Sequence, residues 1–145
     1  MGLKLEELSV GTSLPESKRQ VTQERINNYA AASGDFNPIH VDPEFASKTS
    51  LGGTVAHGML ILAYLSEFMT DSFGKSWLNS GNLSTRFKGP AYPGDTITVS
   101  GKVTGVQREN GSILIDCDVL CRNQRDEPVI ICETKVRVIT DEDSS

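Results

Sequence analysis

The stretch His57-Gly58-Met59-Leu60-Ile61-Leu62-Ala63-Tyr64-Leu65-Ser66-Glu67-Phe68-Met69 is apolar on nearly every side until Glu67. A helix that is apolar on most of its faces is buried in a protein interior. The pattern therefore predicts a long internal helix from His57 to about Asp71. No run in the sequence approaches the roughly 18 apolar residues of a membrane-spanning helix, so we expect no membrane partner.

The sequence after Gly74 changes to the two-residue period of strands. Apolar and polar residues alternate along 112–122 and 129–139, which is typical of antiparallel strands with one covered face. The Asn110-Gly111 pair between two of the segments indicates a tight hairpin. The apolar face of the sheet and the apolar helix must both be buried, and each can bury the other. We therefore predict an α+β fold, an antiparallel sheet wrapped around a long central helix. The predicted strands are 82–88, 96–107, 112–122 and 129–139.

The first half of the chain carries helix boundaries and a turn. A short strand is expected near 18–21, and Thr22 is a suitable N-cap for a helix that ends at about Ser33, before Gly34. Pro38 keeps the preceding Asn37 out of the helical region, so the segment 34–40 is predicted to be a turn rather than a helix. Asp42-Pro43 then begins a short helix.

The length and the net charge of the chain limit the number of domains and the kinds of partner that we expect. The chain has 145 residues and a net charge of −5, which fits a single domain over 1–140 with an acidic tail over 141–145. The negative charge argues against a nucleic-acid partner. The three cysteines, Cys117, Cys121 and Cys132, are expected to be reduced and buried, which indicates a cytoplasmic protein.

Asp35 and His40 are the first candidates for chemistry. A turn can direct both side chains at one point, and a carboxylate with an imidazole makes a workable acid/base pair at neutral pH. On spacing alone a structural role, with Asp35 in an Asx turn, remains the simpler interpretation. Gly58, at the start of the buried helix, offers a free backbone N–H with no side chain in front of it, which suits an oxyanion.

Other polar residues leave both structural and functional interpretations open. Ser66 can bond to a catalytic group or to its own helix, and Glu67 can be a catalytic carboxylate or a solvent contact. Arg86 and Lys88 share one face of a strand and could meet phosphates, although a solvated face is equally consistent. No Gly-rich phosphate loop and no nucleophile-elbow motif is present.

Three segments together resemble the MaoC-like dehydratases, which include the (R)-specific enoyl-CoA hydratases. The first runs from Tyr29 through Gly34-Asp35-Phe36-Asn37-Pro38-Ile39-His40 to Ala46, the second is Ala56-His57-Gly58-Met59-Leu60, and the third is Arg86-Phe87-Lys88-Gly89-Pro90 with Pro93-Gly94-Asp95. The three occur in the family's order and extend over most of the chain. The resemblance implies a hot-dog fold, in which the central helix is the sausage and the sheet is the bun, and it implies homodimers.

The resemblance also implies roles for particular residues. Asp35 and His40 would hold and activate water, the N–H of Gly58 would bind the thioester oxygen, and Ser66 would support the site by hydrogen bonding. Apart from the resemblance, Asn37, His57, Arg86 and Lys88 are further candidates for substrate binding. The substrates would be acyl thioesters of coenzyme A or of acyl carrier protein, and neither a metal nor a redox cofactor would be needed.

The expected function is therefore an (R)-specific enoyl-CoA hydratase, equivalently a 3-hydroxyacyl thioester dehydratase. The open alternatives are a carrier-protein dehydratase of fatty-acid synthesis, a hot-dog thioesterase that uses Glu67 or Asp71, and a non-catalytic subunit of a hydratase heterodimer. The acyl chain length is not readable from the sequence, because side chains that could shape an acyl tunnel could equally be core. These side chains are Leu60, Ile61, Tyr64 and Leu65.

Overall fold

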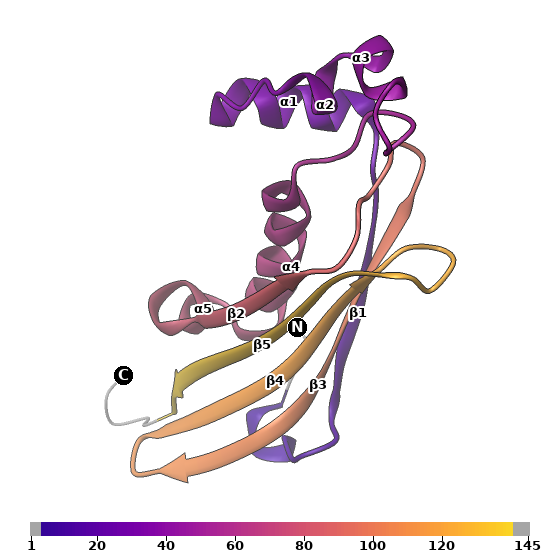
Figure 1. Cartoon of the computed structure of the whole chain (residues 1–145). Coiled ribbons are helices and arrows are strands. Elements are labelled where there is room, and N and C mark those ends of the chain that lie inside the picture. Colours follow the sequence, from indigo (N-terminus) through magenta and orange to yellow (C-terminus); the bar gives the residue numbers. More distant parts are fainter. Residues whose placement is uncertain (1–3, 141–145) are drawn as a thin grey trace.

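A computed structural model describes residues 4–140 as one curved sheet with helices on its concave side (Figure 1). The predicted acidic tail, 141–145, lies outside the described residues. The helices are a 3₁₀ turn η1 (Leu5–Glu7), α1 (Gln23–Ser33), α2 (Pro38–Val41), α3 (Pro43–Ser47), α4 (Gly58–Phe73) and α5 (Lys75–Ser80). The strands are β1 (Ser13–Gln20), β2 (Asn82–Phe87), β3 (Thr96–Glu109), β4 (Ser112–Arg122) and β5 (Pro128–Ile139).

The sheet is antiparallel throughout, in the order β1-β3-β4-β5-β2. Glu109 pairs with Ser112 across a two-residue turn, which confirms the hairpin predicted at Asn110-Gly111. Gly111 takes a positive φ of 85° in this turn, a conformation that glycine adopts without strain. The strand β2, which follows the helices in sequence, returns to the sheet at its far edge, beside β5.

The central helix α4 lies along the concave face, and its apolar side chains form one core with the sheet (Figure 1). Leu65, Phe68 and Met69 are fully enclosed there, against inward-facing residues of β4 and β5 such as Ile115 and Val136. Polar residues of the same strands face outward. The predicted α+β arrangement, with one covered face on the sheet, is confirmed. Within residues 4–140, none of the helices combines the length and the apolarity needed to cross a membrane.

The small helices α1, α2 and α3 gather near the N-terminal end of α4 (Figure 1). The side chain of Thr22 accepts a hydrogen bond from the N–H of Arg25, and Gly34 ends α1 with a φ of 82°, as predicted. Asp42 caps α3 by accepting hydrogen bonds from the N–H groups of Glu44 and Phe45. Each boundary is local, which is why the sequence pattern was sufficient to place it.

Two local predictions need correction, and one short helix was not predicted. The segment 34–40 is not a turn throughout, because Asn37 caps a one-turn helix, α2, that contains His40. Pro38 occupies the first turn of that helix, where a missing N–H costs nothing. The first strand covers Ser13–Gln20 and therefore begins earlier than the predicted 18–21. The helix α5 was not predicted, since its six residues are too few to display a period.

Candidate active site

The side chains of Asp35 and His40 approach each other at the point where α1 passes into α2. Asp35 Oδ2 lies 4.0 Å from His40 Nε2, which is too far for a direct hydrogen bond and leaves room for one bridging water. Half of the Asp35 side chain is exposed, whereas that of His40 is nearly enclosed. The structure therefore brings the two predicted side chains together, with the Asp35 carboxylate open to solvent.

Backbone contacts hold the two side chains in these positions. The N–H of Asn37 donates to Asp35 Oδ1 at 3.2 Å, which forms the predicted Asx turn. His40 Nδ1 lies 2.8 Å from the carbonyl oxygen of Val55, which can only accept, so Nδ1 carries the proton. In the neutral ring, His40 Nε2 is then the nitrogen with the free lone pair, and it is the one that faces Asp35.

Gly58 is the first residue of α4 and is exposed. Within residues 4–140 its N–H has no protein acceptor, as expected for the first turn of a helix. The aromatic ring of Phe87, at the end of β2, lies against it, and a Cβ built on Gly58 would come within 2.8 Å of Phe87 Cε1. The free amide at the positive end of the helix dipole can stabilise a negative oxygen.

His57 connects the acid/base pair with this helix end. Its Nε2 lies 2.9 Å from the backbone oxygen of Asp35, and its ring stacks on that of His40 with centroids 3.8 Å apart. The residue is only 3% exposed, so the structure gives no surface for the predicted contact with substrate.

Asp35, His40 and His57 also form a group of possible metal ligands, with their candidate atoms within 4.8 Å of one another. A tetrahedral zinc, with bonds of about 2.0–2.2 Å, needs neighbouring ligand atoms roughly 3.4 Å apart. The separation of Asp35 Oδ2 from His40 Nε2, 4.0 Å, is wider than this. The absence of a metal requirement stays a prediction.

Ser66 and Glu67 have partners other than the acid/base pair. Ser66 Oγ accepts a hydrogen bond of 3.0 Å from Trp77 Nε1, on α5. It lies eight residues beyond Gly58, about 12 Å along the helix axis. Glu67 makes an ion pair of 2.8 Å with Arg19, on β1. The structure therefore brings neither side chain to Asp35 and His40.

The remaining predicted ligand-binding residues lie at different places. Asn37 is exposed, and its side-chain oxygen accepts from the N–H of Ile39, so part of its side chain serves as a helix cap. Arg86 is exposed and pairs in register with Ile131, an outward-facing residue of β5. Lys88 is exposed beside a surface groove of about 430 Å³ that includes Arg125. Substrate binding by Asn37, Arg86 and Lys88 stays a prediction.

The four candidates for an acyl tunnel all belong to α4 and are buried in the core. Tyr64 differs from the others, because its hydroxyl is enclosed without a hydrogen-bond partner. An enclosed unpaired hydroxyl is unfavourable and marks a place where the interior is not a purely apolar core. The four residues are Leu60, Ile61, Tyr64 and Leu65.

Residues 8–120 match the family model described as the MaoC like domain. The match extends over more than half of the chain and includes the acid/base pair, the start of α4 and most of the sheet. The chain belongs to the MaoC-like domain family. Its fold is accordingly the hot-dog fold of that family, as the resemblance of the three sequence segments indicated.

Relatives of this MaoC-like chain carry consistent names. It is 34% identical over 108 residues to an (R)-specific enoyl-CoA hydratase of Aeromonas caviae, an alignment that covers 74% of this chain and 79% of the relative. It is 30% identical over 125 residues to 3-hydroxyacyl-thioester dehydratase Z of Mycobacterium tuberculosis, covering 82% and 83%. An unliganded R-hydratase structure from Pseudomonas aeruginosa superimposes with a TM-score of 0.81 at 26% identity, covering 94% of this chain and 85% of that one.

Three contributors to the MaoC-like site were missed by sequence reasoning. Val55 provides the carbonyl that fixes the His40 ring, Tyr29 packs its ring 4.8 Å from that of His57, and Phe87 covers Gly58. No residue type predicts a carbonyl contact, because every residue has a carbonyl. Phe87 was available as a signal, since it stands between Arg86 and Lys88 and must face the opposite side of the strand.

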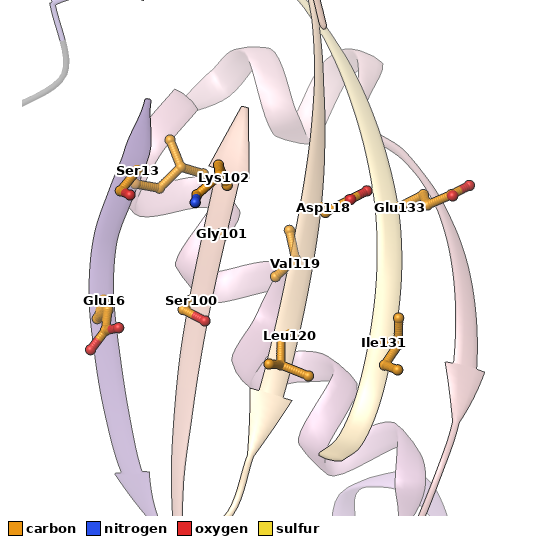
Figure 2. Close-up of a pocket in the computed structure, with 11 residues that line it drawn as sticks. Ser13, Glu16, Ser100, Gly101, Lys102, Asp118, Val119, Leu120, Ile131 and Glu133 are labelled. Carbon is orange, nitrogen blue, oxygen red and sulfur yellow. The ribbon is translucent and has the colours of Figure 1, made fainter. Parts of the chain in front are cut away.

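A large groove of the molecule lies away from this site. A cavity of about 540 Å³ lies on the outer face of the sheet. Figure 2 shows the residues that line it, with α4 behind the strands. Lys102, Asp118 and Glu133 project into it, from β3, β4 and β5 respectively. Since Asp35, His40 and Gly58 are not among its lining residues, the groove and the candidate active site are separate features.

Proposed function

We propose that this chain is an (R)-specific enoyl thioester hydratase, which in the reverse direction is a 3-hydroxyacyl thioester dehydratase. The observation that carries the proposal is the gap of 4.0 Å between Asp35 Oδ2 and His40 Nε2. This gap lies beside a helix start with a free backbone amide at Gly58. The names of the relatives, a hydratase and a dehydratase acting on thioesters, support the same reaction class.

The geometry matches the needs of the reaction. A water in the gap, about 2.8 Å from each group, has both of its protons directed at lone pairs. Its oxygen attacks C3 of the 2-enoyl thioester, a C3–O bond forms, and the π electrons move to the thioester oxygen as an enolate. The N–H of Gly58 stabilises that charge, an interaction that in other enzymes contributes about 10²–10³-fold in rate. The proton removed from water returns through the pair to C2, so no net proton is consumed.

The direct test replaces each member of the pair with a polar amide side chain that is a poor proton acceptor. Asp35→Asn and His40→Gln should each lower kcat for crotonyl-CoA hydration by about 10²–10⁴-fold, because each removes one proton acceptor. Loss of enoyl absorbance measures the rate, and chiral analysis of the product should find the (R)-3-hydroxyacyl thioester. Circular dichroism should show an unchanged fold. The matched control is Asp42→Asn, since Asp42 caps α3 and asparagine is an equally good cap.

Full activity in either variant, or a control as inactive as the variants, would overturn the assignment. Thioesterase activity would appear as free thiol without a hydroxyacyl product. Glu67, one of the two carboxylates considered for that alternative, forms an ion pair with Arg19 on β1. Activity that appears only after a second protein is added would indicate a non-catalytic subunit instead.

We propose coenzyme A or acyl carrier protein as the carrier, without a metal or redox cofactor. The exposed cations Arg86 and Lys88 suit the phosphates of either carrier. Thioesters of both carriers, with chains from C4 to C16, would identify the preferred substrate. Replacement of Arg86 and Lys88 by glutamine should raise KM for the preferred carrier and leave kcat unchanged. An unchanged KM would remove both residues from the binding site.

We further propose that the chain forms a homodimer in the cytoplasm. The outer edge of β2 has no neighbouring strand within the described sheet. Apolar side chains at Phe36, Met59 and Phe87 are more than half exposed, and a second copy would cover such a surface. Sedimentation should give twice the monomer mass, and a monomer that is fully active would contradict the proposal. The free cysteines, Cys117, Cys121 and Cys132, are all buried and fit a reducing compartment.

A further inference from the structure

His57 is in contact with every part of the candidate site. Its side chain reaches the backbone of Asp35 and the ring of His40, and its own backbone immediately precedes Gly58. The ring is enclosed, at 3% exposure, and Tyr29 closes another side of it at a tilt of 56°. A side chain in this position can align the three groups without touching a substrate.

The hydrogen bonds of the two histidines require opposite tautomers. The Asp35 carbonyl oxygen can only accept, so His57 Nε2 carries the proton. His57 Nδ1 is therefore a bare nitrogen, and it is buried without a partner. In His40 the arrangement is reversed, since Nδ1 donates to Val55 and the bare nitrogen is Nε2. Each ring is thus fixed by a backbone carbonyl.

We infer that His57 is a positioning residue that holds the backbone of Asp35 and the ring plane of His40 in register with the amide of Gly58. The inference rests on the proposed hydratase function and adds a component to its site. The physical reason is that proton transfer depends on placement to a fraction of an ångström, and a displacement of about 1 Å can cost 10²-fold in rate. A hydrogen bond and a stacked ring from one enclosed side chain restrict both reacting groups together.

Two substitutions distinguish the effect of the hydrogen bond to Asp35 from that of the ring stacking on His40. His57→Phe keeps a ring for stacking and removes the donor to Asp35. His57→Gln removes the ring and keeps an N–H donor near the position of Nε2. We expect kcat to fall about 10–100-fold in the phenylalanine variant, with KM within about two-fold of the original value. The glutamine variant should have a kcat several-fold higher than that of the phenylalanine variant. A higher KM with kcat unchanged would indicate a substrate contact and overturn the inference.

A measurement without turnover keeps this test independent of the hydratase assignment. The chain contains two histidines, so long-range ¹⁵N–¹H correlation spectra can be assigned with one variant. At pH of about 8.5, where an unperturbed imidazole is neutral, His57 should show a protonated Nε2 and His40 a protonated Nδ1. The inference would be refuted if both histidines had the same tautomer, or if His57 exchanged between its two tautomers. Absence of hydratase activity with opposite tautomers would instead refute the proposed function alone.

Discussion

Gly58 illustrates at the scale of a single residue how a missing side chain shapes the site. It leaves the first amide of α4 open, and it leaves room for the ring of Phe87. A methyl group in its place would meet that ring at 2.8 Å, which is closer than van der Waals contact. Phe87 is 54% exposed in the single chain, so its ring can move aside there at little cost.

Gly58→Ala should therefore affect activity more than stability. We expect the free energy of unfolding to change by less than about 1 kcal/mol, since the clash is with an exposed side chain rather than with backbone. The rate of hydration should fall at least about 10-fold, because the methyl group lies beside the oxyanion amide. Urea unfolding and enoyl absorbance measure the two effects. Unchanged hydration would mean that the thioester oxygen does not approach the amide on the side where the methyl group lies.

The sequence could single out candidate site residues that carry a local signal. Asp35 and His40 have titratable side chains, and Gly58 stands at a predicted helix start. Val55 could not be identified, because its contribution is a carbonyl oxygen. The interior position of His57 also escaped, since burial depends on elements far apart in the sequence.

At the scale of elements, the end of α1 is coupled to the site. Gly34 has a φ of 82° and is followed directly by Asp35. A residue with a Cβ is strained in this conformation, so Gly34→Ala should lower the free energy of unfolding by about 1 kcal/mol. It should also lower kcat, because the strain displaces Asp35.

Gly11→Ala provides the matched control, since Gly11 also has a positive φ, 98°, and no neighbour that a Cβ would meet. Its backbone N–H bonds to Val103, on β3, away from Asp35. We expect a similar loss of stability with kcat unchanged. If both variants retained full kcat, the junction between α1 and Asp35 would not control the site.

The contact between α4 and α5 tests a prediction that the structure places in doubt. Ser66 was expected to support the active site, but its hydroxyl accepts from the indole of Trp77. Ser66→Ala would leave that buried N–H unpaired, so we expect a loss of about 1–3 kcal/mol in the free energy of unfolding. The folded enzyme should retain its turnover rate, and a drop of about 10-fold or more in that rate would restore the catalytic role of Ser66.

For the whole molecule, periodicity predicted which strand faces are buried but not the strand order. The pairings of β1 with β3 and of β2 with β5 join segments separated by many residues, for which no local pattern exists. Only the β3–β4 hairpin had a local indicator, at Asn110-Gly111. The antiparallel class and the enclosed helix were predictable because each leaves a period in the sequence.

The buried thiols give the whole molecule a pH dependence in the alkaline range. Burial raises the pKa of Cys117 from 9.0 to about 11 and that of Cys121 to about 12. Well below pH 9 both thiols are protonated in the folded and unfolded chains, and the pKa difference costs nothing. As the pH rises from 9 toward these folded values, the unfolded chain loses protons first, so stability must decrease.

We expect the midpoint of urea unfolding, measured by circular dichroism, to decline between pH 9 and pH 11 in buffers that differ only in pH. Cys121→Val keeps an apolar group in the same place and should show a shallower decline than the parent. Equal slopes in the two proteins would mean that other groups, such as lysines and tyrosines, account for the alkaline loss.

The bond between Trp77 and Ser66 also has a spectroscopic consequence. Trp77 is the only tryptophan in the chain and is 6% exposed, with its indole N–H engaged on α4. Its fluorescence should be blue-shifted in the folded protein and should shift to the red when α5 separates from α4. Because this indole contacts neither Asp35 nor His40 through any hydrogen bond of the described residues, the emission offers a native optical probe of the helix junction.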